Sequence, residues 1–304
     1  MAEGQSLTGR TLGFIGLGIM GRPMVMNLLK AGANVIGFDT NAEVVADLTK
    51  SGMSSAPSPE AVAQACPLVI LMLPDTAIVE KVVMGTNGVR AGLQKGAIVM
   101  DMGTTRVAST KELAREVQAQ GAEYVDAPVS GGQVGAEQGT LSIMAGATEE
   151  AFATVKPVLE AMGKNVTRIG DIGAGQVAKA ANQIIVGTTI GAVAEALTLA
   201  KRAGVDPAVV REALCGGFAS SRILELHGKR MVEGNFVPGG RCTTQRKDMF
   251  QALEYGESLG LDLPLTSAVK GMYDSLITEG HGDLDHSALV KIIEGEVPHE
   301  PQNQ

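Results

Sequence analysis

The chain has 304 residues, enough for two domains, and its 33 acidic and 25 basic side chains give a net charge of −8. This charge disfavours nonspecific binding to nucleic-acid phosphates or anionic lipid, so we expect no nucleic-acid and no membrane partner, and a small molecule as the ligand. A hydrophobic content of 45% with 19% charged residues excludes an intrinsically disordered chain.

The cysteines and the N-terminus indicate the cell compartment. Cys66, Cys215 and Cys242 are odd in number and far apart, without the spacing of a disulfide framework or a zinc site. The opening MAEGQSLTGR lacks the apolar core of an export signal. We therefore expect a cytoplasmic protein with reduced thiols.

The histidines give no reason to expect a metal. His281 and His286 are five positions apart on a predicted loop, which matches no standard metal-ligand spacing. His227 and His299 are predicted to be surface residues, and Asp285 is predicted to cap a helix that starts with Ser287.

From Thr11 to about Ile169, short apolar runs alternate with amphipathic stretches, as in strands separated by crossover helices. The predicted strands are Thr11–Ile15, Asn34–Phe38, Leu68–Leu73, Ala97–Asp101, Glu123–Val125 and Leu141–Ala145. Several runs are apolar at consecutive positions, which predicts a parallel sheet with both faces covered by helices. We expect a doubly wound Rossmann-type NAD(P)-binding domain over residues 1–169.

Beyond Gly170 helical periods dominate, which predicts an all-helical domain over residues 170–304 for substrate binding and dimerisation. Its longest predicted helix is Gln176–Arg202. Gly187 and Gly191 share one face of this helix and would admit a close neighbour, either from another subunit or within one chain. The apolar segment Ile184–Ala200 carries Glu195 and is too short for a membrane span, so we expect a buried helix.

A glycine-rich turn follows the first predicted strand. The sequence GLGIMG fits G-x-G-x-x-G, and its residues are Gly16, Leu17, Gly18, Ile19, Met20 and Gly21. The first glycine permits a tight turn, the second lets a pyrophosphate approach the backbone, and the third packs helix on strand. Asp39 ends the second predicted strand, where it would accept the ribose hydroxyls and repel a 2′-phosphate. NAD is therefore favoured over NADP; the alternative is an acidic residue that merely opens a loop.

Three further clusters suggest a substrate site. Ser130, Gly131 and Gly132 can form a concavity of N–H groups for a carboxylate, although a glycine-rich turn without a ligand is the alternative. Lys179 and Asn182 are three apart and so share a helix face, where the lysine is either solvated or held in a cleft. Lys247 lies at the start of a later helix, and an ordinary charged face is the other interpretation of that position.

Taken together, these motifs resemble the β-hydroxyacid dehydrogenase family, whose members are 3-hydroxyisobutyrate dehydrogenase-like and related to 6-phosphogluconate dehydrogenase. The similarity extends from about Thr11 to Glu294 and includes four signatures in family order: GFIGLGIMGRPM, DAPVSGGQVGAEQGTL, GAGQVAKAANQ and QRKDM. One departure is visible at Ile78, where 3-hydroxyisobutyrate dehydrogenase carries an asparagine that contacts the cofactor.

The resemblance implies a role for each matching residue. Lys179 corresponds to the family's catalytic lysine, and Asn182 to the amide beside it. The segment 130–132 corresponds to the substrate-carboxylate loop, and Lys247 to a lysine near cofactor and substrate. The dinucleotide-lining positions are the turn 16–21, Asp39, Leu73, Pro74 and Thr104.

The resemblance also implies an activity. We expect reduction of tartronate semialdehyde to glycerate with NADH. The alternative is oxidation of 3-hydroxyisobutyrate, or the activity of another small β-hydroxyacid dehydrogenase or semialdehyde reductase. A dinucleotide-sensing protein is the non-enzymatic alternative, but such a protein would not need Lys179, Asn182 and the carboxylate loop together. By analogy, and because of the long apolar helix, we expect a homodimer or homotetramer.

Overall fold

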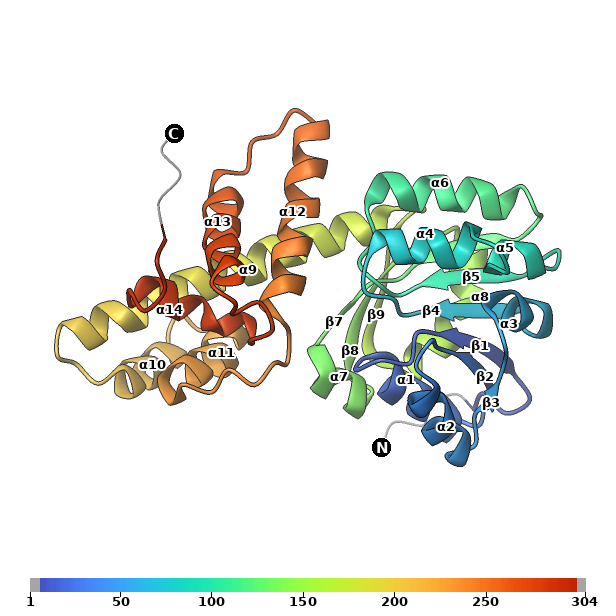
Figure 1. The fold of residues 1–304 in the computed structure, drawn as a ribbon, viewed down its shortest axis with the longest axis horizontal. Coiled ribbons are helices and arrows are strands. Elements are labelled where there is room, and N and C mark those ends of the chain that lie inside the picture. The colour runs from blue at the N-terminus through green and yellow to red at the C-terminus, as the bar shows by residue number, and fades with distance from the viewer. Residues whose placement is uncertain (1–5, 300–304) are drawn as a thin grey trace. The chain divides into compact units, whose positions relative to one another are not determined.

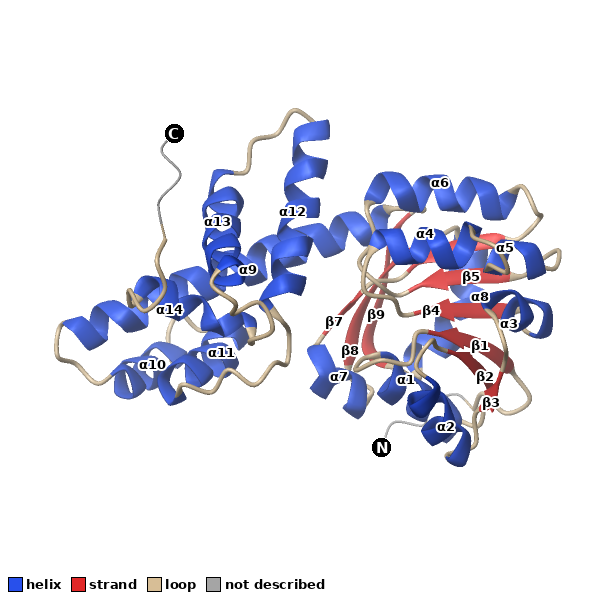
Figure 2. Cartoon of the chain, viewed as in Figure 1, coloured by secondary structure: helices blue, strands red, loops and turns tan. Residues whose placement is uncertain are grey.

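The computed structural model describes residues 6–299, which form two compact units (Figures 1 and 2). The boundary between them falls at Lys179 and Ala180, inside helix α9 (Ala174–Arg202) and not ahead of it. Each unit is described by itself.

The first unit is an α/β fold whose strands are joined by helices. Its strands are β1 (Thr11–Ile15), β2 (Asn34–Phe38), β3 (Ser54–Ser55), β4 (Leu68–Leu71), β5 (Ile98–Asp101), β6 (Glu123–Asp126), β7 (Val129–Ser130), β8 (Leu141–Gly146) and β9 (Gly163–Gly170). Its helices are α1 (Gly21–Lys30), α2 (Ala42–Lys50), α3 (Pro59–Ala65), α4 (Thr76–Met84), α5 (Val89–Gly92), α6 (Val107–Gln118), α7 (Gly132–Gln138) and α8 (Glu149–Glu160). The expected Rossmann-type architecture is confirmed.

The strand order in the sheet is β3-β2-β1-β4-β5-β6-β8-β7, with β9 paired to β8. Strands β1 to β6 pair in parallel, whereas β8 runs antiparallel to β6 and β7. The chain reverses direction across the sheet between β1 and β4, and ligands of such sheets bind beside this point, at the carboxyl ends of the strands.

All six predicted strands are present, with ends that shift by at most two residues. Strands β3, β7 and β9 were not predicted. Two of them have two residues each, too few to show a period. In β9, GKNVTRIG, the two apolar side chains, Val166 and Ile169, are three positions apart, so the strand shows neither an apolar run nor an alternation, and most of its residues are exposed or half-buried.

Both faces of the parallel sheet are covered, as the consecutive apolar runs predicted. In β4, Leu68 and Ile70 pack into the core on one face, while Val69 and Leu71 pack into the core on the other. The first core also takes side chains from α1, α2, α7 and α8, and the second from α3 to α6. Gly13 in β1 allows α3 to approach closely, since a Cβ there would lie 2.4 Å from Val62 Cγ1.

The second unit is helical. It contains the rest of α9 together with α10 (Pro207–Cys215), α11 (Arg222–Glu233), α12 (Cys242–Ser258), α13 (Pro264–Thr278), the 3-10 helix η1 (His286–Leu289) and α14 (Val290–Ile293). Gly187 of α9 faces α12, where a Cβ would lie 2.6 Å from Met249 Sδ. Gly191 similarly faces Val269 of α13. Both glycines therefore serve helix packing within this chain, one of the two alternatives considered.

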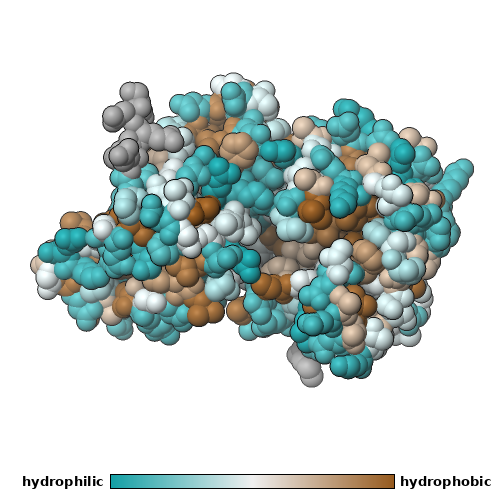
Figure 3. Space-filling model, viewed as in Figure 1, coloured by the Kyte–Doolittle hydropathy of each residue, from teal (hydrophilic) through white to brown (hydrophobic). Residues whose placement is uncertain are grey.

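Among residues 6–299, α9 alone has the length and apolar content to cross a membrane, but half of its apolar window is buried inside the protein. Ile190 and Ala194 of this helix belong to the core of the helical unit. On the face drawn in Figure 3, hydrophilic residues cover most of this unit, and hydrophobic residues lie between them in small groups. The helix therefore has the burial of a core helix.

Candidate active site

The glycine turn connects β1 to α1 at the point where the sheet order reverses. Gly16 has a φ of +97°, and a Cβ there would lie 2.3 Å from the Met72 carbonyl oxygen. At Gly21 a Cβ would lie 1.9 Å from the Gly16 oxygen, so the helix starts in direct contact with the turn. Gly18, in contrast, is exposed, and a Cβ there would have no described atom within 4 Å. The turn therefore leaves open backbone where a pyrophosphate has to approach.

Asp39 holds the turn from the end of β2. Its Oδ2 accepts a hydrogen bond from the Leu17 N–H (2.6 Å), and its Oδ1 accepts one from the Asn41 N–H (2.8 Å). A carboxylate has about four acceptor positions, so these two bonds leave capacity for ribose hydroxyls. The arrangement fits the adenosine end of a dinucleotide.

Other predicted cofactor residues lie at the same edge of the sheet. Leu73 and Pro74 follow β4 and Thr104 follows β5, and both strands are parallel neighbours in the sheet. A Cβ at Gly16 would lie 3.0 Å from a methyl carbon of Leu73, which shows how closely the turn and this segment pack. The structure thus brings segments together that are more than fifty residues apart in the sequence.

The segment from Ser130 to Gly132 joins β7 to α7. Ser130 is half-buried and pairs with Ser142 across the sheet. Gly131 and Gly132 have φ values of +137° and +60°, which side chains rarely adopt. Both glycines are exposed, so their backbone is accessible to a ligand.

Lys179 lies in the second turn of α9 and is not solvated. Its residue exposure is 7%, and its Nζ donates a hydrogen bond of 2.9 Å to the Val129 carbonyl oxygen. Val129 directly precedes Ser130. The ammonium group is therefore held at the start of the predicted carboxylate loop.

The beginning of α9 is held by one buried carboxylate, that of Asp126, and by the buried amide of Gln176. Asp126, at the end of β6, accepts hydrogen bonds from the backbone N–H groups of Gly173 (2.7 Å) and Gln176 (2.9 Å). Burial and the nearby Asp101 carboxylate raise the pKa of Asp126 to about 7, although the two backbone hydrogen bonds oppose the rise. The Gln176 side chain in turn donates to the Gly103 carbonyl oxygen and accepts from the Thr105 N–H.

Asn182 and Lys247 belong to one polar chain in the helical unit. The Asn182 amide donates to Gln183 Oε1 (2.7 Å), and Gln183 donates to Asp248 Oδ2 (2.6 Å). The Nζ of Lys247 lies 3.2 Å from Asp248 Oδ1. Gln183 and Asp248 are buried, so this chain fixes both predicted residues through two groups that were not predicted as site residues.

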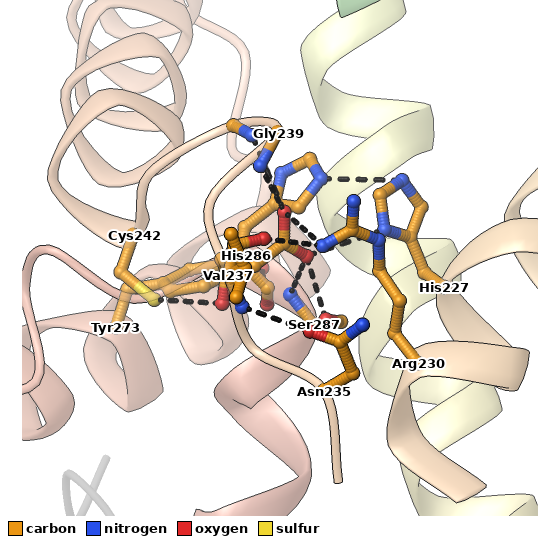
Figure 4. Close-up of polar contacts among 11 residues, drawn as sticks. His227, Arg230, Asn235, Val237, Gly239, Cys242, Tyr273, His286 and Ser287 are labelled. Carbon is orange, nitrogen blue, oxygen red and sulfur yellow. Dashed lines mark hydrogen bonds and ion pairs between the residues drawn. The ribbon is translucent and has the colours of Figure 1, made fainter. Parts of the chain in front are cut away.

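A second cluster of polar residues, in the helical unit, comes closest to a set of metal ligands (Figure 4). The Nε2 atoms of His227 and His286 lie 3.2 Å apart, and His227 Nδ1 lies 3.4 Å from Asp285 Oδ1. The prediction that His227 is a surface residue is therefore wrong. Asp285 caps η1 as predicted, since it accepts from the Ser287 N–H.

The Asp285 carboxylate is occupied by donors of the protein. It also accepts from the Ser287 hydroxyl and the Gly239 N–H, and Arg230 Nη1 lies 3.4 Å away. Burial raises the pKa of Asp285, but the facing His227, the charge of His286 and these hydrogen bonds outweigh it and hold the pKa far below its usual range. The cluster is thus an internally compensated network that stabilises the helical unit.

The main residues missed by the sequence reasoning are buried polar groups that hold other site residues: Asp126, Gln176, Gln183 and Asp248. Asp126 and Asp248 lie inside motifs that were quoted, and the ordinary surface preference of carboxylates concealed their role. A carboxylate at the end of an apolar strand, as in EYVD, is the signal that could have identified Asp126.

Two family models together match most of the chain. The NAD-binding domain of 6-phosphogluconate dehydrogenase matches residues 11–170, and the NAD-binding domain of NADP-dependent 3-hydroxyisobutyrate dehydrogenase matches residues 173–293. The 2-hydroxy-3-oxopropionate reductase of Escherichia coli is 46% identical over 93% of this chain and 97% of that protein. The 2-(hydroxymethyl)glutarate dehydrogenase of Eubacterium barkeri is 37% identical over 93% and 94%. A crystal structure of 3-hydroxyisobutyrate dehydrogenase from Salmonella typhimurium superposes with a TM-score of 0.85 at 33% identity, covering 93% of this chain and 99% of that one.

Proposed function

Because the chain belongs to the β-hydroxyacid dehydrogenase family, an oxidoreductase family, we propose that it reduces tartronate semialdehyde (2-hydroxy-3-oxopropionate) to glycerate with NADH. The 46% identical relative bears the name of this activity. The segments GDIGAGQVAKAANQ, EALTLAKRAGVDP and GHGDLDHSAL also resemble that enzyme more than other members of the family.

The observation that carries the proposal is the placement of Lys179. A buried ammonium group that donates to the Val129 carbonyl is positioned, dehydrated and adjacent to Ser130. A bound nicotinamide dinucleotide supplies the hydride for this chemistry. Lys179 then donates a hydrogen bond and finally its proton to the carbonyl oxygen of the aldehyde, stabilising the alkoxide charge as it develops. In the reverse direction the neutral amine accepts the hydroxyl proton.

The other residues bind and orient. The backbone N–H groups and hydroxyl of residues 130–132 hold the substrate carboxylate, so that the reacting carbon has one orientation. Asn182, one turn beyond Lys179 on α9, orients the lysine or the substrate hydroxyl. Lys247, held by Asp248, contributes positive charge for the substrate and cofactor.

NADH is the proposed reductant because Asp39 would repel a 2′-phosphate, and the next residues, Thr40 and Asn41, offer no cation for one. We also propose a cytoplasmic homodimer or homotetramer, which light scattering at micromolar concentration would test. A monomer would contradict this assembly without affecting the proposed activity.

Oxidation of 3-hydroxyisobutyrate is the second candidate, because the 3-hydroxyisobutyrate dehydrogenase of Pseudomonas aeruginosa is 34% identical to this chain. The assay follows NADH and NADPH oxidation with a panel of aldehyde acids that includes tartronate semialdehyde, glyoxylate, succinic semialdehyde and methylmalonate semialdehyde, the oxidised form of 3-hydroxyisobutyrate. Preference for the last of these, or for NADPH, would overturn the corresponding part of the proposal. Cofactor binding without turnover of any substrate would favour a sensor.

Replacement of the lysine tests the mechanism. Lys179→Ala is expected to lower kcat by at least about a thousandfold, with the Kd for NADH changed less than about threefold, since the proton donor is lost and the glycine turn is untouched. Fluorescence titration measures the Kd. An active Lys179→Ala enzyme would show that another group supplies the proton.

A further inference from the structure

Asp126 is a buried charged group that the proposed mechanism does not use. Its two carboxylate oxygens bind different donors. Oδ1 accepts from the Gly173 N–H, just before α9, and Oδ2 accepts from the Gln176 N–H in the first turn of α9. Free N–H groups at a helix start need acceptors, and here one side chain from a different element serves two of them. The carboxylate thereby fixes both the position and the direction in which α9 begins.

The surroundings of Asp126 leave little freedom for this contact. A Cβ at Gly146, its antiparallel partner in β8, would lie 2.5 Å from Oδ1. A Cβ at Gly175 would lie 2.4 Å from the Met144 carbonyl oxygen and 2.7 Å from the Asp126 carbonyl oxygen. The first turn of α9 therefore lies directly against the backbone of β6 and β8, which is possible because glycine occupies both positions.

The short segment that contains Asp126 also contains the acceptor of the Lys179 hydrogen bond. The Asp126 side chain anchors the first turn of α9, and Lys179 follows Gln176 by three residues, in the next turn. The Val129 carbonyl, which accepts from Lys179, follows Asp126 by three residues along the chain. We propose that Asp126 is a positioning residue that sets the place of the Lys179 ammonium group and thereby the rate of proton transfer. This inference rests on the proposed role of Lys179.

The charge of Asp126 matters because only the carboxylate offers acceptors on both oxygens. Protonation turns one of the two oxygens into a hydroxyl group, which is a donor and accepts from a backbone N–H only weakly. The titratable groups that influence this site are Asp101 at the end of β5 and Tyr124 in β6, and burial together with the negative charges of Asp101 and Asp126 raises the pKa of Tyr124 well above its usual value. Protonation of Asp126, whose pKa is about 7, is therefore expected to weaken its hydrogen bonds to the start of α9 as the pH falls, while the overall stability of the fold rises because a buried charge is removed.

The test uses the full-length enzyme in the reduction direction. Lys179 acts there as an acid, so its own titration limits kcat at high pH, and a loss of kcat at low pH reports another group. We expect the wild-type kcat to fall as the pH drops through about 7. In Asp126→Asn we expect kcat at pH 8 to be about 10- to 100-fold lower, a KM for NADH within about twofold, and no fall of kcat near pH 7.

Asp206→Asn is the matched control. Asp206 also caps a helix, since its Oδ1 accepts from the Ala208 N–H at 2.8 Å, but it is outside the candidate site residues. Its kcat and pH profile should equal those of the wild type. If Asp126→Asn keeps the wild-type kcat and pH profile while Lys179→Ala is inactive, the positioning role is wrong and the proposed function stands. If Lys179→Ala is active, the proposed function loses its proton donor instead.

A measurement on the wild-type enzyme covers the case in which Asp126→Asn does not fold. Amide hydrogen exchange, corrected for the intrinsic effect of pH, should be faster at pH 6 than at pH 8 for the N–H groups of Gly173 and Gln176. The Ala208 N–H serves as the internal reference, because its acceptor Asp206 is exposed. Equal protection of Gly173 and Gln176 at the two pH values would overturn the inference.

Discussion

Each unit of the molecule contains a fully buried aspartate that accepts hydrogen bonds from backbone N–H groups. The pKa values of the two carboxyl groups are nevertheless shifted in opposite directions. In the Rossmann unit, burial and Asp101 raise the pKa of Asp126 to about 7. In the helical unit, the pKa of Asp285 is far below its usual range although the residue is equally inaccessible. Burial alone therefore does not decide the protonation state.

The difference lies in the sign of the neighbouring charges. Asp285 faces Arg230 and two histidine rings, so its charge is compensated inside the helical unit. Asp126 has neutral backbone donors and a second carboxylate, that of Asp101, nearby, so no positive charge compensates its own charge and the neighbouring carboxylate repels it. The helical unit thus gains stability from its buried charge, whereas the Rossmann unit maintains one at a cost in stability, as is common at functional sites.

The largest effect expected from this contrast is the loss of Asp285. In Asp285→Ala the Arg230 guanidinium and the Gly239 N–H lose a buried acceptor, and the free energy of unfolding should fall by about 3–5 kcal/mol. Urea unfolding measures this change. Asp283→Ala is the control, because Asp283 is 86% exposed in its pair with Arg241, and it should shift stability by less than about 0.5 kcal/mol. Equal effects of the two variants would show that the compensated network contributes little.

The next prediction concerns the pH dependence of stability, which should differ in sign between Asp126 and Asp285. A raised pKa means that the folded state binds the proton more tightly than the unfolded state, so the stability contribution of Asp126 falls as the pH rises from about 4 to about 7, by at most about 1.4 kcal/mol per pH unit. The lowered pKa of Asp285 has the opposite sign: its stabilisation is complete above about pH 4 and is lost on acidification below that value.

Thermal unfolding at pH 5 and pH 8 checks this sign. The difference in Tm between wild type and Asp126→Asn should change between the two pH values, in favour of the wild type at pH 5. The difference between wild type and Asp285→Asn should instead shrink from pH 5 to pH 3, because the unfolded carboxyl group takes up a proton in this range while the folded one stays ionised. Parallel behaviour of the two variants would contradict the assigned pKa directions.

Much of the Rossmann unit could be predicted because its buried strands carry consecutive apolar residues. Runs such as LVIL in β4 predict a strand that is covered on both faces. Strand β9 could not be found in this way, since it has only two separated apolar side chains and no residue after Gly163 is fully buried. The long helix was predicted to within two residues at its start, but its first turn belongs to the α/β unit because Asp126 binds it there.

For the candidate site, the sequence predicted Lys179 and the glycine turn as candidate residues, and the comparisons show the family to which the chain belongs. Lys179 and the glycine turn stand in motifs with fixed spacing, so they were accessible to sequence reasoning. The groups that hold them were not, because the contact of Asp126 with Gln176 joins residues fifty positions apart. Spacing along the chain carries no information about such pairs until the fold is known.

The short distance along the chain between Asp126 and Val129 constrains how this enzyme can be altered. The Asp126 side chain and the Val129 carbonyl, three residues apart, bind two successive turns of α9. The distance between them therefore sets where Lys179 lies. A single residue inserted between Asp126 and Val129 would keep every side chain and would still be expected to displace the Lys179 ammonium group. Any redesign that is meant to keep Lys179 in its place would therefore have to preserve the spacing within residues 126–130 and within residues 173–179.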